Sequence, residues 1–132
     1  MQIKARALTL NVNLRNDVYV LGFDGGTGKS YTYEVLSDLA DNEKQPFMAV
    51  TYQKDFNENK FIQQYYEEQP ELVFMDRFDL YITESLCEFL RKNQSKSVFL
   101  LDLKSMMLLS KVTPMIAKVD FSKGVINYDY DV

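Results

Sequence analysis

A glycine-rich segment that ends in a lysine and a serine carries the clearest chemistry in this sequence. Gly25, Gly26 and Gly28 come just before Lys29 and Ser30. Glycines let backbone N–H groups converge on an anion, and a lysine and a hydroxyl beside them suit a phosphate and its magnesium ion. A helix that begins here would add the partial positive charge of its N-terminus. We therefore expect this segment to bind phosphate.

The residues on either side of the segment have the patterns of a strand and a helix. The run 18–23 is largely apolar and β-branched, which is typical of a strand buried in the middle of a sheet. Beyond Lys29, apolar residues recur at helical spacing up to about Asp41. The order strand, glycine-rich loop and helix is the one that presents a phosphate to a helix N-terminus.

Strands and helices alternate along the rest of the chain. Alternating polarity predicts a strand over 1–14, which we expect to pair with 18–23 as an opening β-hairpin. Further strands are expected at 47–52, 71–76 and 96–102, helices at 61–70 and 83–93 with Thr83 as the N-cap, a short helix at 103–110, and a C-terminal hairpin at 115–132. This order predicts an α/β fold in one domain spanning 1–132: a three-layer, mostly parallel sheet with an N-terminal β-hairpin-like strand and a C-terminal β-hairpin.

Residues 26–30, followed later by an apolar strand that ends in aspartate, resemble the P-loop NTPase superfamily with its Walker A and Walker B motifs. The resemblance implies a P-loop-type sheet and the cofactors ATP (or GTP) and Mg²⁺. The loop departs from the family pattern, because Phe23 stands five residues before Gly28 and the nearest glycine is Gly22. The loop has therefore gained one residue or lost its first glycine, and 26–30 alone is in register.

The resemblance also implies roles for individual residues. Lys29 would contact the β- and γ-phosphates, and Ser30 would bind magnesium together with an acid at the end of a neighbouring strand. That acid is Asp76 by our preference and Asp102 as the alternative, and Lys29 and Asp76 are the expected catalytic residues. The expected nucleotide-binding residues are Gly25, Gly26, Thr27, Gly28, Lys29, Ser30 and Tyr31.

The residue after Asp76 bears on hydrolysis. Many hydrolytic members of the superfamily have a glutamate there to orient the attacking water, whereas this chain has Arg77. Asp79 and Glu84 are close in sequence but lack the expected spacing. We expect weak hydrolysis. Arg77 could contact phosphate, pair with Asp79 or face a partner subunit, and of these we expect a plain surface ion pair.

Composition excludes several other kinds of site. The 132 residues include no histidine, so His-based catalysis and His metal ligands are excluded. Cys87 is the only cysteine and falls among apolar residues at helical spacing, which predicts a buried side chain. The net charge of −4, with basic residues scattered, does not favour nucleic acid as a ligand. No apolar run is long enough for a membrane span, and we expect a cytoplasmic protein.

These observations predict a magnesium-dependent ATP- or GTP-binding protein. An alternative is a non-catalytic protein-interaction module of the same fold, an accessory or mobile-element protein that binds a larger partner or itself, with nucleotide absent or structural. A third hypothesis is a DNA-associated ATPase. The aromatic residues of 61–66, with Tyr128 and Tyr130, are expected to pack in the core or at sheet edges rather than stack on bases.

Overall fold

The computed structural model describes residues 1–5, 8–21, 29–40, 45–104, 109 and 111–130. Its strands form one eight-stranded sheet in the order β1-β2-β8-β7-β3-β6-β5-β4. The strands are β1 (Gln2–Ala5), β2 (Leu8–Val12), β3 (Asp17–Leu21), β4 (Phe47–Val50), β5 (Leu72–Met75), β6 (Val98–Leu101), β7 (Met115–Ser122) and β8 (Val125–Tyr130). The α-helices in these residues are α1 (Lys29–Ala40), α2 (Glu58–Glu68) and α3 (Glu84–Asn93), and a 3₁₀ turn, η1 (Phe78–Leu80), follows β5.

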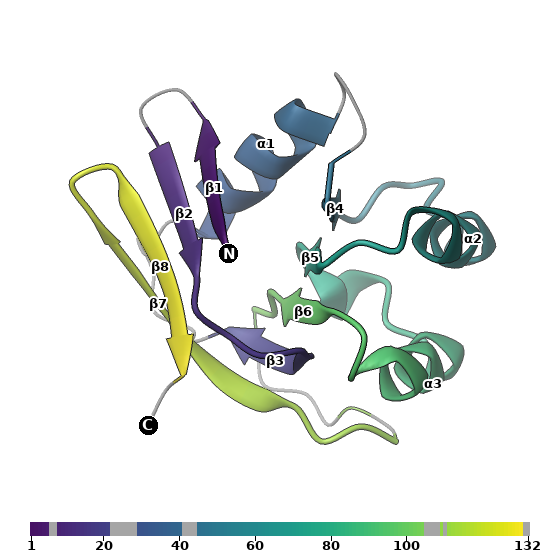
Figure 1. Cartoon of the computed structure of the whole chain (residues 1–132). Helices are drawn as coiled ribbons and strands as arrows, with labels where there is room; N and C mark the ends of the chain where they lie inside the picture. Colours follow the sequence, from purple (N-terminus) through teal and green to yellow (C-terminus); the bar gives the residue numbers. More distant parts are fainter. Residues whose placement is uncertain (6–7, 22–28, 41–44, 105–108, 110, 131–132) are drawn as a thin grey trace.

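The sheet combines a parallel block with two hairpins. Strands β3, β6, β5 and β4 run parallel, whereas β1 pairs with β2 and β7 pairs with β8 in antiparallel hairpins. The hairpins join the sheet through β2–β8 and β3–β7. The strands curl around α1 as a half-barrel, while α2 and α3 lie outside the parallel block (Figure 1).

The predicted three-layer, mostly parallel P-loop-type sheet is therefore wrong. Half of the strands lie in antiparallel hairpins, and the sheet is a mixed half-barrel of eight strands. The opening hairpin was also wrongly predicted, because 1–14 supplies both β1 and β2, and β3 lies between β7 and β6. Alternating polarity specifies which face of a strand is buried, but it does not specify the neighbouring strand.

Several predicted elements are confirmed. The C-terminal hairpin is present as β7 and β8, and its turn uses Lys123 and Gly124 at φ of 51° and 78°. The helices expected at 29–41, 61–70 and 83–93 correspond to α1, α2 and α3. Thr83 caps α3, since its Oγ1 accepts a hydrogen bond of 3.1 Å from the Leu86 N–H. The short helix expected at 103–110 falls largely outside the described residues.

Two apolar clusters fill the two faces of the sheet. Alternation along β3 sends Tyr19 and Leu21 into the cluster around α1, and Val18 and Val20 into the cluster beneath α2 and α3. Cys87 belongs to the second cluster at 1% exposure, so its predicted burial is confirmed. The strands β3, β5 and β6 are therefore covered on both faces.

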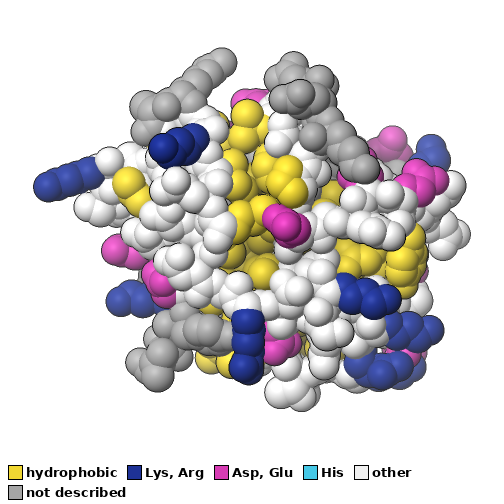
Figure 2. Space-filling model, in the orientation of Figure 1, with side chains coloured by type: hydrophobic (Ala, Val, Ile, Leu, Met, Phe, Trp, Pro, Cys, Tyr) yellow, Lys and Arg dark blue, Asp and Glu magenta, His cyan; other side chains and the backbone are white. Residues whose placement is uncertain are grey.

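The surface carries charges of both signs. On the face shown in Figure 2, Lys and Arg side chains lie around the rim with Asp and Glu among them, and hydrophobic side chains gather towards the middle. No helix within the described residues is both long enough and apolar enough to cross a membrane.

Candidate functional site

Two acids and a hydroxyl meet at the carboxyl edge of the parallel block. The register pairs Val20 with Leu101, Leu101 with Met75, and Met75 with Val50. Carboxyl ends of parallel strands lie at one sheet edge. The residues that come next therefore form a row along that edge, namely Leu21, Asp102, Asp76 and Thr51.

Hydrogen bonds hold this row in place. The backbone N–H of Asp76 donates to the Val50 carbonyl at 2.8 Å, and that of Asp102 donates to the Met75 carbonyl at 3.0 Å. Thr51 Oγ1 donates to Asp76 Oδ2 at 2.7 Å. The threonine thus orients the Asp76 carboxylate while the other carboxylate oxygen keeps its acceptor capacity.

The chain turns sharply after Asp76. Arg77 has left-handed backbone angles (φ 50°, ψ 45°), which are uncommon and unfavourable for a residue with a Cβ. The turn lets the Phe78 N–H donate to the Asp102 carbonyl at 2.9 Å, and Tyr81 Oη donate to the Asp76 carbonyl at 2.8 Å. Burial, and then the charge of Asp76, raises the pKa of Tyr81, which stays protonated. These contacts fix the two acid-bearing strand ends to each other.

Arg77 pairs with its near neighbour. Its Nη2 and Nε donate to the two carboxylate oxygens of Asp79 at 2.9 and 3.2 Å. The hydrogen bonds from Arg77 hold the pKa of the Asp79 carboxyl below its usual value. The predicted surface ion pair is confirmed. The residue that follows Asp76 is therefore an arginine whose charge is paired with Asp79. Glu84 lies elsewhere, in the groove between α2 and α3.

The structure accounts for the predicted phosphate-binding residues in part. Gly25, Gly26, Thr27 and Gly28 lie outside the described residues. Strand β3 ends at Leu21 and α1 begins at Lys29, so Lys29 and Ser30 open the helix as expected. Tyr31, in the same helical turn, is 55% exposed.

Helix α1 is fastened to the sheet close to Asp102. The hydroxyls of Thr32 and Tyr128 are hydrogen-bonded, and both side chains are buried. Burial raises the pKa of Tyr128, the bond to Thr32 lowers it in part, and the charge of Asp102 raises it again.

We expect Tyr128→Phe to lower the free energy of unfolding by about 1 kcal/mol, because it removes the buried bond to Thr32. Since folding raises the tyrosine pKa, the unfolded chain loses this proton first. The contribution is complete below about pH 10 and decreases as the pH rises above it. Urea unfolding at pH 8 and pH 11 measures both effects. The variant should show the shallower decline, and an equal decline in both proteins would contradict this assignment.

The donor set suits magnesium bound with a phosphate. The described residues hold no group of three or more acidic, cysteine or histidine side chains that could form a metal site alone. Asp76 and Asp102 supply two carboxylates at adjoining strand ends. Mg²⁺ is commonly bound by one or two carboxylates, with substrate phosphates and waters completing its octahedron.

A hollow of about 530 Å³ opens beside this row. Tyr33 of α1, Thr51 after β4, and Lys60 of α2 line it, together with Phe56 and Asn57 of the intervening loop. Because Thr51 both lines the hollow and binds Asp76, the hollow adjoins the acidic row. It provides a polar and aromatic space next to the Asp76 carboxylate.

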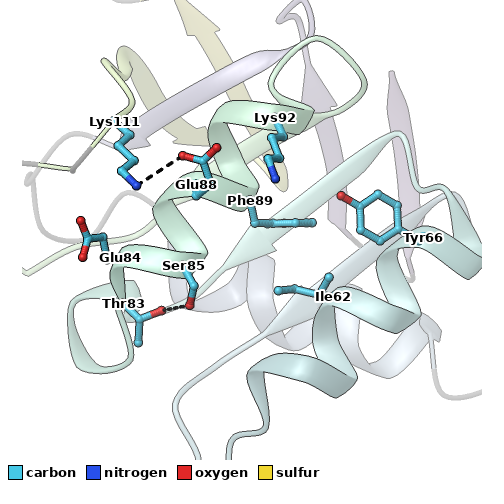
Figure 3. Close-up of a pocket in the computed structure, with 9 residues that line it drawn as sticks. All are labelled: Ile62, Tyr66, Thr83, Glu84, Ser85, Glu88, Phe89, Lys92 and Lys111. Carbon is cyan, nitrogen blue, oxygen red and sulfur yellow. Dashed lines mark hydrogen bonds and ion pairs between the residues drawn. The ribbon is translucent and has the colours of Figure 1, made fainter.

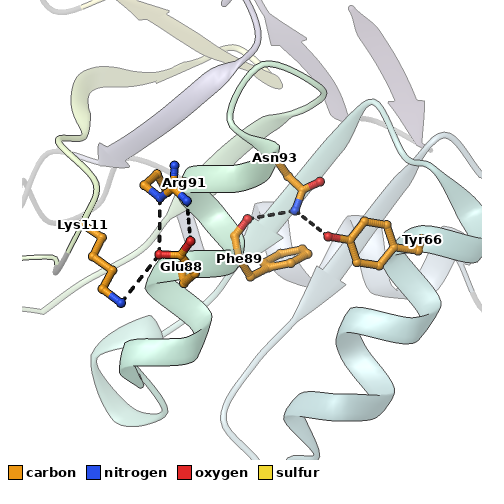
Figure 4. A network of polar contacts seen from close by, with 6 residues as sticks. All are labelled: Tyr66, Glu88, Phe89, Arg91, Asn93 and Lys111. Carbon is orange, nitrogen blue, oxygen red and sulfur yellow. Dashed lines mark hydrogen bonds and ion pairs between the residues drawn. The ribbon is translucent and has the colours of Figure 1, made fainter.

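A second, larger groove of about 700 Å³ runs between α2 and α3 (Figure 3). Ile62, Tyr66 and Phe89 give it an apolar floor, and its charged side chains are of both signs. The polar contacts here are internal (Figure 4): Glu88 binds Arg91 and Lys111. Hydrogen bonding to Arg91 lowers the pKa of Glu88.

The same groove contains a bond that links its two helices. Asn93 Nδ2 donates to Tyr66 Oη at 3.0 Å and to the Phe89 carbonyl at 2.8 Å, which joins α3 to α2. These two bonds use the Asn93 amide nitrogen and hold the helices together. The carboxyl edge is therefore the better candidate site.

Sequence analysis missed the partners of the acids. Thr51 lies near the end of the strand predicted at 47–52, as Asp76 does in the strand predicted at 71–76, so strand register would have found it. The hydrogen bonds of Tyr81 and Thr32 left no local pattern in the sequence. The first depends on the turn after β5 and the second on the C-terminal hairpin.

Comparison of the chain with protein-family models, curated proteins and solved structures finds no match.

Proposed function

We propose that this protein binds a magnesium nucleotide, ATP or GTP, at the carboxyl edge of β3, β6 and β5. The observation that supports the proposal is the row of strand ends at this edge, where β3 ends at Leu21 and Asp102 and Asp76 follow the neighbouring strands β6 and β5. In the sequence, the glycine-rich residues stand between the end of β3 and Lys29, the first residue of α1. Backbone amides and a helix N-terminus suit phosphate, and the acids suit its magnesium ion.

The proposal gives each residue a role. Lys29 neutralises the β- and γ-phosphates, and the amides of 25–30 bind phosphate oxygens. Ser30 and Asp76 hold magnesium, directly or through water, with Asp102 as the alternative acid. When bound, magnesium would neutralise negative charge on the phosphates. Thr51 orients Asp76 for this task.

Hydrolysis in this proposal is slow. A water attacking the terminal phosphate needs a residue to orient it. Arg77 occupies the position after Asp76 and is paired with Asp79. We therefore expect phosphate release at most slightly above that of buffer containing magnesium.

Calorimetric titration tests the proposal directly. Mg-ATP and Mg-GTP should bind with one site per chain, and chelation of magnesium should weaken binding. A bound nucleotide should also raise the midpoint of thermal unfolding, because it binds the folded state alone. If neither nucleotide binds at millimolar concentration, the proposal is wrong.

Separate replacement of the two acids identifies the magnesium ligand. Asp76→Asn should lower the affinity for Mg-ATP about tenfold, equivalent to about 1.4 kcal/mol, and leave ATP binding without magnesium unchanged. Asp102→Asn should have the smaller effect, and Asp120→Asn, an exposed acid on β7, serves as the matched control. The reverse order would assign the metal to Asp102. Equal affinity in all three variants and the wild type would contradict a carboxylate ligand at this edge.

A further inference from the structure

Two exposed aromatic rings meet beside the first turn of α1. Tyr31 is 55% exposed and Phe121, near the end of β7, is 39% exposed. Their ring centroids are 6.3 Å apart and the ring planes differ by 28°, a stacked arrangement. The pair comes from segments far apart in the sequence and leaves aromatic surface open to solvent.

The C-terminal hairpin holds Phe121 in this position. Phe121 shares a strand face with Ala117 and Val119, which are buried in the cluster around α1. Its cross-strand partner is Ile126, which is fully buried. The bond between Thr32 and Tyr128 fixes the same hairpin to the same helical turn. Phe121 therefore lies on a paired strand rather than in a loop.

The pair lies next to the residues proposed to hold phosphate. Tyr31 is two residues after Lys29, so the two backbones are separated by only about 3 Å along the helix axis. A nucleotide with its phosphates at the start of α1 extends its ribose and base away from them. A flat aromatic surface in the same turn is within reach of that base.

We propose that Tyr31 and Phe121 form the surface on which the nucleobase stacks. This inference rests on the proposed nucleotide binding and adds the base subsite to it. Every base has a π face, and stacking on aromatic side chains is tolerant of base identity. The pair therefore binds ATP and GTP with similar affinity, and Phe121 joins the binding site from the opposite end of the chain.

The test compares nucleotides with a ligand that has no base. Calorimetry is performed with Mg-ATP, Mg-GTP and magnesium tripolyphosphate on the wild type and on Phe121→Ala. The substitution should weaken both nucleotides about tenfold and leave tripolyphosphate unchanged. Phe121→Leu keeps an apolar side chain without the aromatic face and should behave similarly. Ile116→Ala, which removes another exposed apolar side chain of β7, should change none of the three affinities.

The outcomes separate this inference from the proposal beneath it. Lys29→Ala should weaken all three ligands, tripolyphosphate included. If the wild type binds ATP no better than tripolyphosphate, or if both Phe121 variants bind ATP like the wild type, the base subsite is wrong while phosphate binding stands. If no ligand binds the wild type, both proposals fail. Unchanged thermal midpoints without ligand exclude misfolding as the cause of weakened binding.

Discussion

Replacing Lys29 with alanine is expected to lower the affinity for Mg-ATP at least about 100-fold, equivalent to about 2.7 kcal/mol. The ammonium group is the cation proposed to contact the β- and γ-phosphates, and hydrogen bonds between charged groups are about twice as strong as neutral ones. Alanine is a good helix former, so α1 should persist. Calorimetric titration of Mg-ATP into both proteins measures the effect.

Lys118→Ala is the matched control. Lys118 is an exposed lysine on β7, so its removal changes the net charge equally without touching α1. It should leave the affinity within about twofold of the wild type, because isolated surface charges interact weakly through water. If Lys29→Ala bound Mg-ATP as tightly as Lys118→Ala does, Lys29 would not be a phosphate ligand. Circular dichroism of both variants checks that the helical content is retained.

Much of the local structure was predictable because it is encoded in neighbouring residues. The helical spacing of Tyr33, Leu36 and Leu39 predicts α1, and the Thr83 hydroxyl predicts the start of α3. Apolar runs predict β5 and β6, and each strand is followed directly by the aspartate that the sequence indicates. The two acids of the candidate site were thus identifiable without a structure.

The arrangement of the sheet was not predictable by the same means. Residues 1–14 show which face of a strand is buried, but pairing with β8 depends on residues more than a hundred positions away. The half-barrel arises because both terminal hairpins close around α1. The local pattern of residues does not indicate such long-range contacts. For the same reason Phe121 was missed, because only the folded chain brings it to Tyr31.

The centre of β6 is where a single substitution should cost most stability. Phe99→Ala is expected to lower the free energy of unfolding by about 3–5 kcal/mol. Phe99 is fully buried, and its ring centroid lies 5.7 Å from that of Tyr65 and 5.9 Å from that of Phe89. Alanine would leave a cavity between the central strand and both outer helices. Urea unfolding followed by circular dichroism measures the loss.

Phe121→Ala removes the same side chain from a site that is 39% exposed, and it should cost less than about 1 kcal/mol because little packing is lost. A small loss for Phe99→Ala, equal to that of Phe121→Ala, would contradict the packing of β6.

The two variants also separate folding from binding. Phe99→Ala should bind Mg-ATP normally in whatever fraction remains folded, since Phe99 points away from α1. Phe121→Ala should stay folded and bind Mg-ATP poorly, since the proposed role of Phe121 is to stack on the base.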